Sequence, residues 1–460
     1  MQLPPPLSTF PWFVTLCLGV AASLGVARSV AQPVPPAPPP RNALLPRLTP
    51  SLAHSATSGP PPTNLAELRA RGPAALDELL ARYDRLLARD AAMDPGWDPA
   101  IDEVAGQHYA TTSRLYWYTD LAAAEQEAHR LHRPILALRM LGDLRDDLSC
   151  ANSRLFRTTL YANRALSAFL RANFVLYWSS ERPVPTVTID FGDGRKLVRT
   201  TTGNSAHYVL DEDGHVLDVL PGLYAASVFQ TELTKSLAFA ARVRGMTDAA
   251  RIRETVAYHT AALRAADQAW IERAPASYLR GPQPVRGSTE ALARAQRLAS
   301  SKAGIETPDL IAMGFLQPGD IAEDAPEWSA IGQQVWGLVG GDAAGPRPGT
   351  AAHPILDEQS VGLVAMLHDA GPVEQSATAG QLASVIARLE QHIAADTAHN
   401  ELRLRQDIRR HIVDQAVTDF APLNAWIYEV VFATPKADPW LGLRARTTFT
   451  GLPGDGVVLP

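Results

Sequence analysis

The sequence predicts an α/β fold in which a central mixed sheet is flanked by helices and followed by a mainly α-helical C-terminal region. An apolar run from Pro134 to Leu141 has the continuous hydrophobicity of a strand that is covered on both faces. A helical stretch and a second apolar run, Phe174 to Trp178, come next, and such a strand–helix–strand unit closes right-handed into a parallel pair. Two β-hairpin patterns then precede a helical region that begins near Thr247.

The composition is that of a globular protein long enough for two or three domains. The chain has 460 residues, of which 46% are hydrophobic and 20% are charged. Its net charge of -6 gives no broad basic excess, so we expect no nucleic-acid partner. The two cysteines, Cys17 and Cys150, are too few for a thiol-rich metal site.

The first residues are typical of an export signal. An apolar run extends from Phe10 to Val26, and Ser29-Val30-Ala31 is a small-x-small cleavage site. No Lys or Arg precedes the run, which leaves open an uncleaved anchor that would tether the protein to a membrane. We therefore expect an extracytoplasmic protein, periplasmic or secreted, whose mature chain keeps only Cys150.

Composition and periodicity divide the chain into five parts. After the signal peptide or anchor, a Pro-rich stretch offers little to bury and predicts an extended linker. An amphipathic helix follows, with Pro73 in its first turn and Leu76, Leu79, Leu80 and Tyr83 at helical spacing. The expected parts are 1–31 signal peptide or anchor, 32–63 linker, 64–115 N-terminal helical segment, 116–243 α/β domain and 244–460 mainly helical region.

The hairpins and later helices are predicted from turn residues and apolar stripes. Pro183 to Thr202 alternates around Gly192-Asp193-Gly194, and His207 to Leu220 turns at Asp211 to Gly214. Helices are expected at 225–242, 249–270, 289–301 and 379–415.

Two groups of histidines have the spacing of metal ligands. His129 and His132 lie one helical turn apart, and His392, Asp396 and His399 share one face of the long helix at 379–415. The exposed polar face of a helix produces the same pattern, and we prefer that interpretation. No metal ion or other cofactor is expected.

The segment from Trp117 to about Lys235, roughly a quarter of the chain, resembles a thioredoxin-like domain of the diverged extracytoplasmic bacterial type. The residues that carry the resemblance are Trp117, Asp120, Arg133-Pro134-Ile135-Leu136, Cys150, Asn173-Phe174-Val175, Tyr208 to Gly214 and Leu220-Pro221-Gly222. The order and spacing of these motifs together, rather than any one of them, carry the resemblance. The resemblance implies a thioredoxin-like central mixed sheet with flanking helices.

The resemblance also implies that Cys150 stands where these proteins carry their Cys-x-x-Cys dithiol. Here the motif is Cys150-Ala151-Asn152-Ser153, so the resolving Cys is replaced by Ser153 and a complete dithiol cycle cannot run. The family places a cis-proline opposite the Cys, and that place falls on Ser205, which with Asn204 would line a substrate or partner groove.

Three interpretations of Cys150 remain open. It can be a monothiol nucleophile whose thiolate is stabilised by a helix N-terminus and by Ser153. It can be a buried residue that packs as a small hydrophobe. It can also pair with a second molecule. The preferred prediction is a binding or scaffold module for an unknown protein partner, and the alternative is a thiol-disulfide exchange enzyme that uses Cys150.

Overall fold

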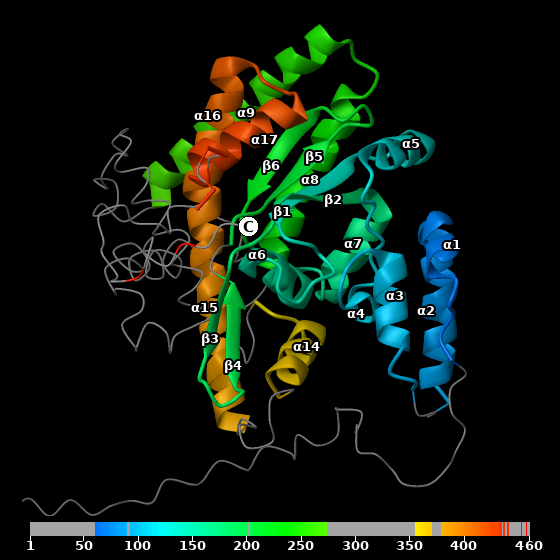
Figure 1. Ribbon diagram of the computed structural model, residues 1–460. Helices are drawn as coiled ribbons and strands as arrows, with labels where there is room; N and C mark the ends of the chain where they lie inside the picture. Colours follow the sequence, from blue (N-terminus) through cyan, green and yellow to red (C-terminus); the bar gives the residue numbers. More distant parts are fainter. Residues whose placement is uncertain are drawn as a thin grey trace, which may run out of the picture. The chain divides into compact units, whose positions relative to one another are not determined.

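A computed structural model of the chain describes residues 60–89, 93–200, 203–273, 355–369 and 379–434, together with residues 436, 437, 439, 440, 452 and 457 (Figure 1). All of these residues belong to one compact unit of the chain, Ser55–Pro460. The expected signal segment, most of the expected linker and the expected helix at 289–301 lie outside these residues.

A four-stranded mixed sheet forms the centre of the fold. Its strands lie in the order β2-β1-β5-β6 and are β1 (Ile135–Leu141), β2 (Val175–Arg182), β5 (Ala206–Leu210) and β6 (Val216–Pro221). β1 and β2 are parallel, with Ile135 opposite Val175, while β5 runs antiparallel to both β1 and β6. The predicted parallel pair is therefore confirmed, because two apolar runs joined by a helical crossover pack side by side.

The crossover between β1 and β2 consists of three helical pieces. These are α6 (Ala151–Leu155), the π-helical turn η2 (Phe156–Leu160) and α7 (Arg164–Asn173). The break falls at Asn163, whose side chain accepts a hydrogen bond from the backbone N–H of Leu166 and so caps α7.

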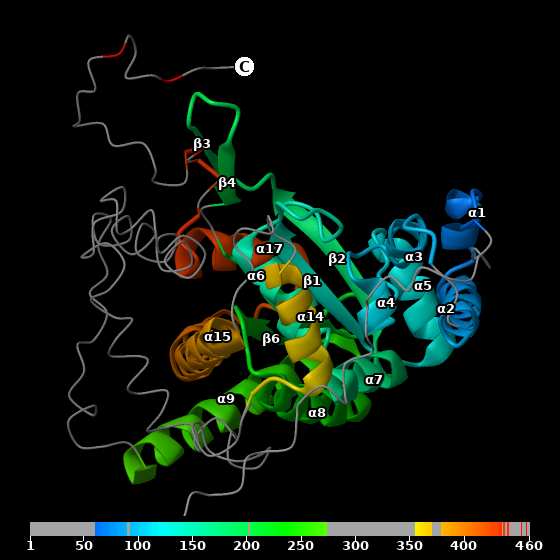
Figure 2. The same ribbon diagram turned by 90° about the horizontal axis from the view of Figure 1, so that it is seen from below.

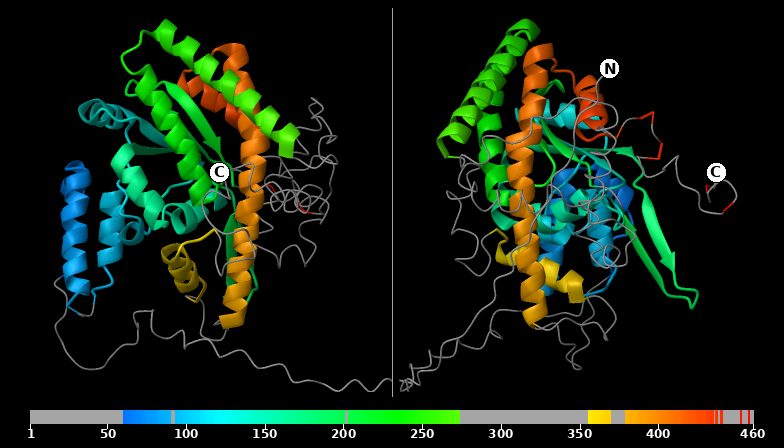
Figure 3. Two further views of the ribbon diagram at one scale, coloured as in Figure 1. Left: turned by 180° about the vertical axis from the view of Figure 1, so that it is seen from behind. Right: turned by 90° about the vertical axis from the view of Figure 1, so that its left-hand side faces the viewer.

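The two predicted hairpins are both present. β3 (Thr186–Asp190) pairs with β4 (Lys196–Thr200) as a separate two-stranded ribbon that extends away from the sheet (Figure 3). Its turn uses Gly192 and Gly194 at φ of 77° and 95°, a backbone region that favours glycine. In the β5–β6 hairpin, the Asp211 carboxylate accepts hydrogen bonds from the backbone of the turn.

Helices from different parts of the chain cover the two faces of the sheet (Figure 2). The ring of His207 on β5 contacts Phe229 of α8 (Ala226–Val243) at a centroid distance of 4.8 Å. The next residue, Tyr208, points to the opposite face and contacts Phe420 of α17 (Phe420–Trp426) at 4.9 Å. Successive side chains of a strand alternate in direction, so α8 and α17 lie on opposite faces.

The mainly helical C-terminal region contributes to the same core as the sheet. Its described helices are α9 (Asp248–Arg273), α14 (Glu358–Asp369), α15 (Ala379–His399), η6 (Asn400–Leu404), α16 (Arg405–Gln415), α17 and η7 (Ile427–Val431). Residues Ala379 to Gln415 form one continuous helix with a π-helical turn at η6, as its apolar stripe predicts. Ile393, Ile408 and Ile412 of this helix are buried in the cluster that contains the sheet residues.

The N-terminal helical segment has a small core of its own. It comprises α1 (Leu65–Ala70), α2 (Pro73–Leu87), α3 (Trp97–Ala105) and α4 (Ala110–Ser113), and Pro73 is the first residue of α2. Leu76, Leu80, Trp97 and Ile101 form its buried centre. The following α5 (Leu121–Leu131) lies beside β2, and the Asp120 carboxylate caps it by accepting from the N–H of Ala123.

Candidate functional site

Cys150 lies at the N-terminus of α6, where the loop after β1 enters the crossover. We call Cys150 and the side chains around it the Cys150 corner. Cys150 is the N-cap residue of α6, and its backbone N–H donates to the carbonyl of Leu141 at 3.2 Å. The extended backbone of Cys150 starts the helix directly after the loop, so the first peptide dipoles of α6 lie beside the thiol. The side chain has no exposed surface, which places the sulfur out of reach of a bulky reagent.

Ser205 is the side chain that faces Cys150. The Cys150 Sγ and Ser205 Oγ atoms are 3.2 Å apart, within hydrogen-bond distance for sulfur. Ser205 directly precedes β5, and its carbonyl accepts from the N–H of Gly222, which holds it against the β5–β6 hairpin. Two candidate site residues separated by 55 positions therefore meet in one buried contact.

Ser153 lies one turn further along α6 and is also fully buried. Its Oγ atom is 2.8 Å from the carbonyl oxygen of Cys150 and 2.7 Å from Oγ of Ser149. One partner is the backbone oxygen of Cys150 and the other is the hydroxyl of Ser149. The Ser153 hydroxyl is therefore satisfied without the thiol.

Asn204 contacts the C-terminal part of the same chain. Its Nδ2 donates to the carbonyl of Phe432 at 3.3 Å, and its own carbonyl accepts from the Tyr428 hydroxyl at 3.3 Å. Burial raises the pKa of Tyr428 well above its usual range, and the nearby Tyr208 and Cys150 raise it further. The expected partner groove at Asn204 and Ser205 is therefore covered by η7 and the residue that follows it.

Further polar side chains around the cysteine were not singled out by the sequence. The Arg157 guanidinium is buried and donates to the carbonyls of Leu144 and Asp146 and to Oγ of Ser149, which ties down the loop before Cys150. The Tyr161 hydroxyl and Nε2 of His207 are 2.6 Å apart in the core. Only the position of His207 on β5, two residues after Ser205, could have indicated one of them in advance.

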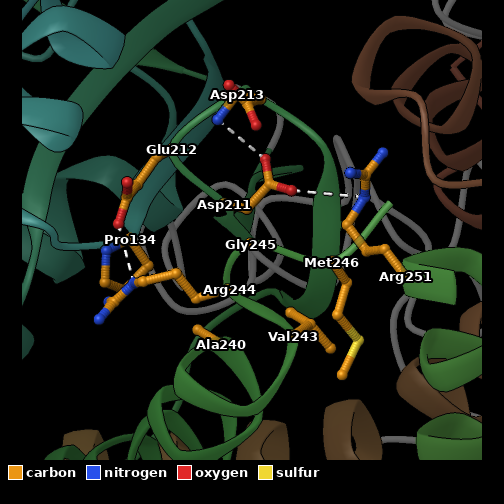
Figure 4. Close-up of a pocket in the computed structure, with 10 residues that line it drawn as sticks. All are labelled: Pro134, Asp211, Glu212, Asp213, Ala240, Val243, Arg244, Gly245, Met246 and Arg251. Carbon is orange, nitrogen blue, oxygen red and sulfur yellow. Dashed lines mark hydrogen bonds and ion pairs between the residues drawn. The ribbon is translucent and has the colours of Figure 1, made fainter. Parts of the chain in front are cut away.

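The turn of the β5–β6 hairpin brings together Asp211, Asp213 and His215, the one group of potential metal ligands within the described ranges. Figure 4 shows that the Asp211 carboxylate already accepts from the backbone N–H of Asp213 and faces Arg251, from which it is 3.4 Å distant. Both oxygen atoms of the Asp211 carboxylate therefore already have partners within the protein. His129 lies beside this turn, with Nε2 3.2 Å from Asp213.

The histidines of the long helix lie on α15. His392, Asp396 and His399 are each partly buried there and have partners within the protein. Across the residues that the structure describes, every helix is too short or too polar to traverse a lipid bilayer.

Comparison of the chain with models of known protein families, with curated proteins and with solved structures found no match.

Proposed function

We propose that residues 116–243 form a thioredoxin-like domain that lacks the dithiol, and that the protein is an exported binding or scaffold module. The strand order β2-β1-β5-β6, with one parallel and two antiparallel pairings, supports the fold. The position of Cys150 after β1 at a helix N-terminus also supports it, as does Ser205 before β5.

The observation that carries the scaffold function is the closure of the Cys150 corner. The thiol has no exposed surface and its neighbour Ser205 has none either. Thiol-disulfide exchange requires a thiolate sulfur that can reach a disulfide of the partner. A sulfur enclosed on all sides cannot meet this geometric demand, so the domain contributes its fold and surface rather than its thiol.

The chemistry of the motif supports the same conclusion. A dithiol cycle needs one sulfur to attack and a second to release the mixed disulfide. Ser153 occupies the second position, and its hydroxyl bonds to the Cys150 carbonyl and to Ser149 instead of the thiol. The proposal requires no cofactor.

Alkylation of Cys150 tests this proposal in the full chain with Cys17→Ser, which leaves one thiol. We expect slow reaction with iodoacetamide at neutral pH and fast reaction after a denaturant is added, because only unfolding exposes the sulfur. The same protein should show no turnover in an insulin-reduction assay with a reductase system. Fast alkylation of the native protein that is abolished by Cys150→Ser would overturn the scaffold function.

A second candidate function, monothiol exchange, is favoured by one observation. Cys150 is the N-cap residue of α6, and a helix N-terminus favours a thiolate. This function requires that Tyr428 and Phe432 move away from Asn204 before a partner can approach. A stable mixed disulfide with a thiol-reactive partner protein, formed by the native chain and absent in Cys150→Ser, would favour it.

Export is part of the proposal and depends on residues 1–31. The apolar run and the Ser29-Val30-Ala31 site predict cleavage, whereas an uncleaved segment would tether the protein to a membrane. N-terminal sequencing of the protein recovered from the extracytoplasmic fraction distinguishes the two forms.

A further inference from the structure

We propose that a cavity beside the outer edge of β2 binds a small organic anion, namely a carboxylate or a phosphate monoester with an apolar body. The cavity has a volume of about 270 Å³ and lies at the end of the sheet where β2 begins. It is formed by the N-terminal helical segment, by α5 and by the turn between α7 and β2, and it is independent of the Cys150 corner.

The apolar part of the lining comes from four separate stretches of the chain. Its members are Pro73, Leu76, Tyr116, Tyr118, Leu131, Phe174, Val175 and Leu176. Leu76 belongs to the core of the N-terminal helical segment, whereas Val175 belongs to the core of the sheet, so the cavity lies where the two cores meet. Aromatic and aliphatic walls of this kind favour a ring or a short hydrocarbon chain.

The charged part of the lining is mostly positive. It contains Arg114, Arg130, Arg133 and Arg171 against the two carboxylates Asp77 and Glu127. Arg130 forms an ion pair with Glu127 at 2.7 Å, and Arg114 pairs with Asp84 of α2 at 2.5 Å. These two arginines are therefore neutralised by the protein itself.

Arg133 and Arg171 are the cations that remain. Neither has a carboxylate within ion-pair distance in the described part of the chain. Arg133 Nη1 donates to the backbone carbonyl of Arg171 at 3.1 Å, so the two residues are neighbours at the same side of the cavity. The other N–H groups of the Arg133 fork and all those of Arg171 have no hydrogen-bond acceptor among the described residues. A planar guanidinium binds carboxylate and phosphate oxygens in pairs, which assigns an anion to this end.

The Tyr118 hydroxyl adds a polar group to the apolar wall. It makes no hydrogen bond within the described ranges, in contrast to the hydroxyl of Tyr116, which donates to the carbonyl of Arg69. The cavity volume of about 270 Å³ is slightly below the roughly 300 Å³ at which pockets for drug-sized ligands begin. The ligand is therefore limited to about one ring. The anion, the apolar wall and the hydroxyl together define an amphiphilic ligand, for which phenyl phosphate and benzoate are suitable probes.

Isothermal titration calorimetry of the full chain in Tris buffer tests the proposal. We expect saturable binding of phenyl phosphate or of benzoate and none of the neutral benzamide, because Arg133 and Arg171 need an anionic partner. Binding of benzamide as tight as that of benzoate would overturn the proposal. So would binding of inorganic phosphate as tight as that of phenyl phosphate, because the apolar wall would then have no role.

The double variant Arg133→Gln/Arg171→Gln removes the two charges that have no carboxylate partner within the described ranges. We expect the affinity for the bound probe to fall by at least about tenfold, which corresponds to about 1.4 kcal/mol, because the anion loses its charge-assisted hydrogen bonds to both guanidinium groups. Arg85→Gln/Arg164→Gln is the matched control, because both are exposed arginines of α2 and α7 outside the cavity. Equal affinity in both double variants, with unchanged thermal unfolding, would overturn the assignment.

Discussion

Asp218 Oδ2 and Arg405 Nη2 lie 2.7 Å apart, and neither side chain has any exposed surface. Asp218 is on β6, at the edge of the sheet, and Arg405 is the first residue of α16. Arg405 also pairs with Glu232 of α8 and with Glu401 of η6, each at 2.7 Å. The buried guanidinium of Arg405 therefore joins α16 to β6, α8 and η6, although β6 and α8 are far from α16 in the sequence.

The first prediction concerns Arg405. Arg405→Met leaves the buried carboxylate of Asp218 without an ion-pair partner among the described residues. Glu232 keeps Lys235 and Arg409, and Glu401 keeps Arg409 at 3.7 Å. We expect the free energy of unfolding to fall by about 3–5 kcal/mol, the usual cost of breaking a buried ion pair by removing one partner. Urea denaturation measures it. Arg410→Met on the same helix is the control, because Arg410 is 54% exposed, and it should change stability by less than about 1 kcal/mol.

The second prediction concerns acid sensitivity. Burial lowers the pKa of His207 to about 3, so the ring stays neutral in the folded protein. An unfolded histidine has a pKa near 6.5, so between these two values the unfolded chain binds the extra proton. The contribution of the neutral His207 to the free energy of unfolding is therefore fully present above about pH 6.5. Below that pH, the free energy of unfolding falls by up to about 1.4 kcal/mol per pH unit as the pH drops toward 3.

His207→Gln removes this titration. Denaturation at pH 7 and pH 5 should show a smaller pH dependence for this variant than for the unmodified chain. An unchanged slope in His207→Gln would contradict a neutral, buried His207. His259 has a pKa lowered to about 4 by burial and contributes in the same direction in both proteins.

The third prediction concerns the cover over the Cys150 corner. Tyr428→Ala removes the hydroxyl that bonds to Asn204 and the ring that packs against Phe432. We expect alkylation of Cys150 in the native Cys17→Ser chain to become at least about tenfold faster. Truncating a buried aromatic side chain lowers stability by about 3–5 kcal/mol, and a tenfold change in the population of an open form needs only about 1.4 kcal/mol. Val430→Ala is the control, since Val430 is exposed on the same turn. Equal rates in both variants would show that η7 does not protect the thiol.

The fourth prediction compares two glycines at nearly the same positive φ. Gly106 and Gly245 have φ of 74° and 72°. A Cβ at Gly106 would lie 2.8 Å from the carbonyl oxygen of Trp117, while a Cβ at Gly245 would have nothing within 4 Å. Gly106→Ala should therefore lower the free energy of unfolding by clearly more than the roughly 1–3 kcal/mol expected for strain alone in Gly245→Ala. Chemical denaturation of both variants measures the difference.

Local sequence features determined the elements of the α/β core. The apolar run of β1, its parallel pairing with the second apolar run, the break near Asn163 and the Gly192–Gly194 turn could all be predicted. The register of the pair, with Ile135 opposite Val175, came from the structure. The reason is that hydrophobic periodicity, helix caps and turn glycines act over a few residues. The place of Ser205 opposite Cys150 came from the resemblance to a family rather than from periodicity.

Only the tertiary structure decided what surrounds these elements. The closure of the Cys150 corner depends on Tyr428 and Asn204, which are 224 positions apart, and the cation at Asp218 comes from Arg405, 187 positions later. Arg133 and Arg171 have no carboxylate partner among the described residues, and this too depends on where the fold places the carboxylates that pair with Arg114 and Arg130. Such pairings follow from how whole helices pack, and no short window of sequence contains both partners.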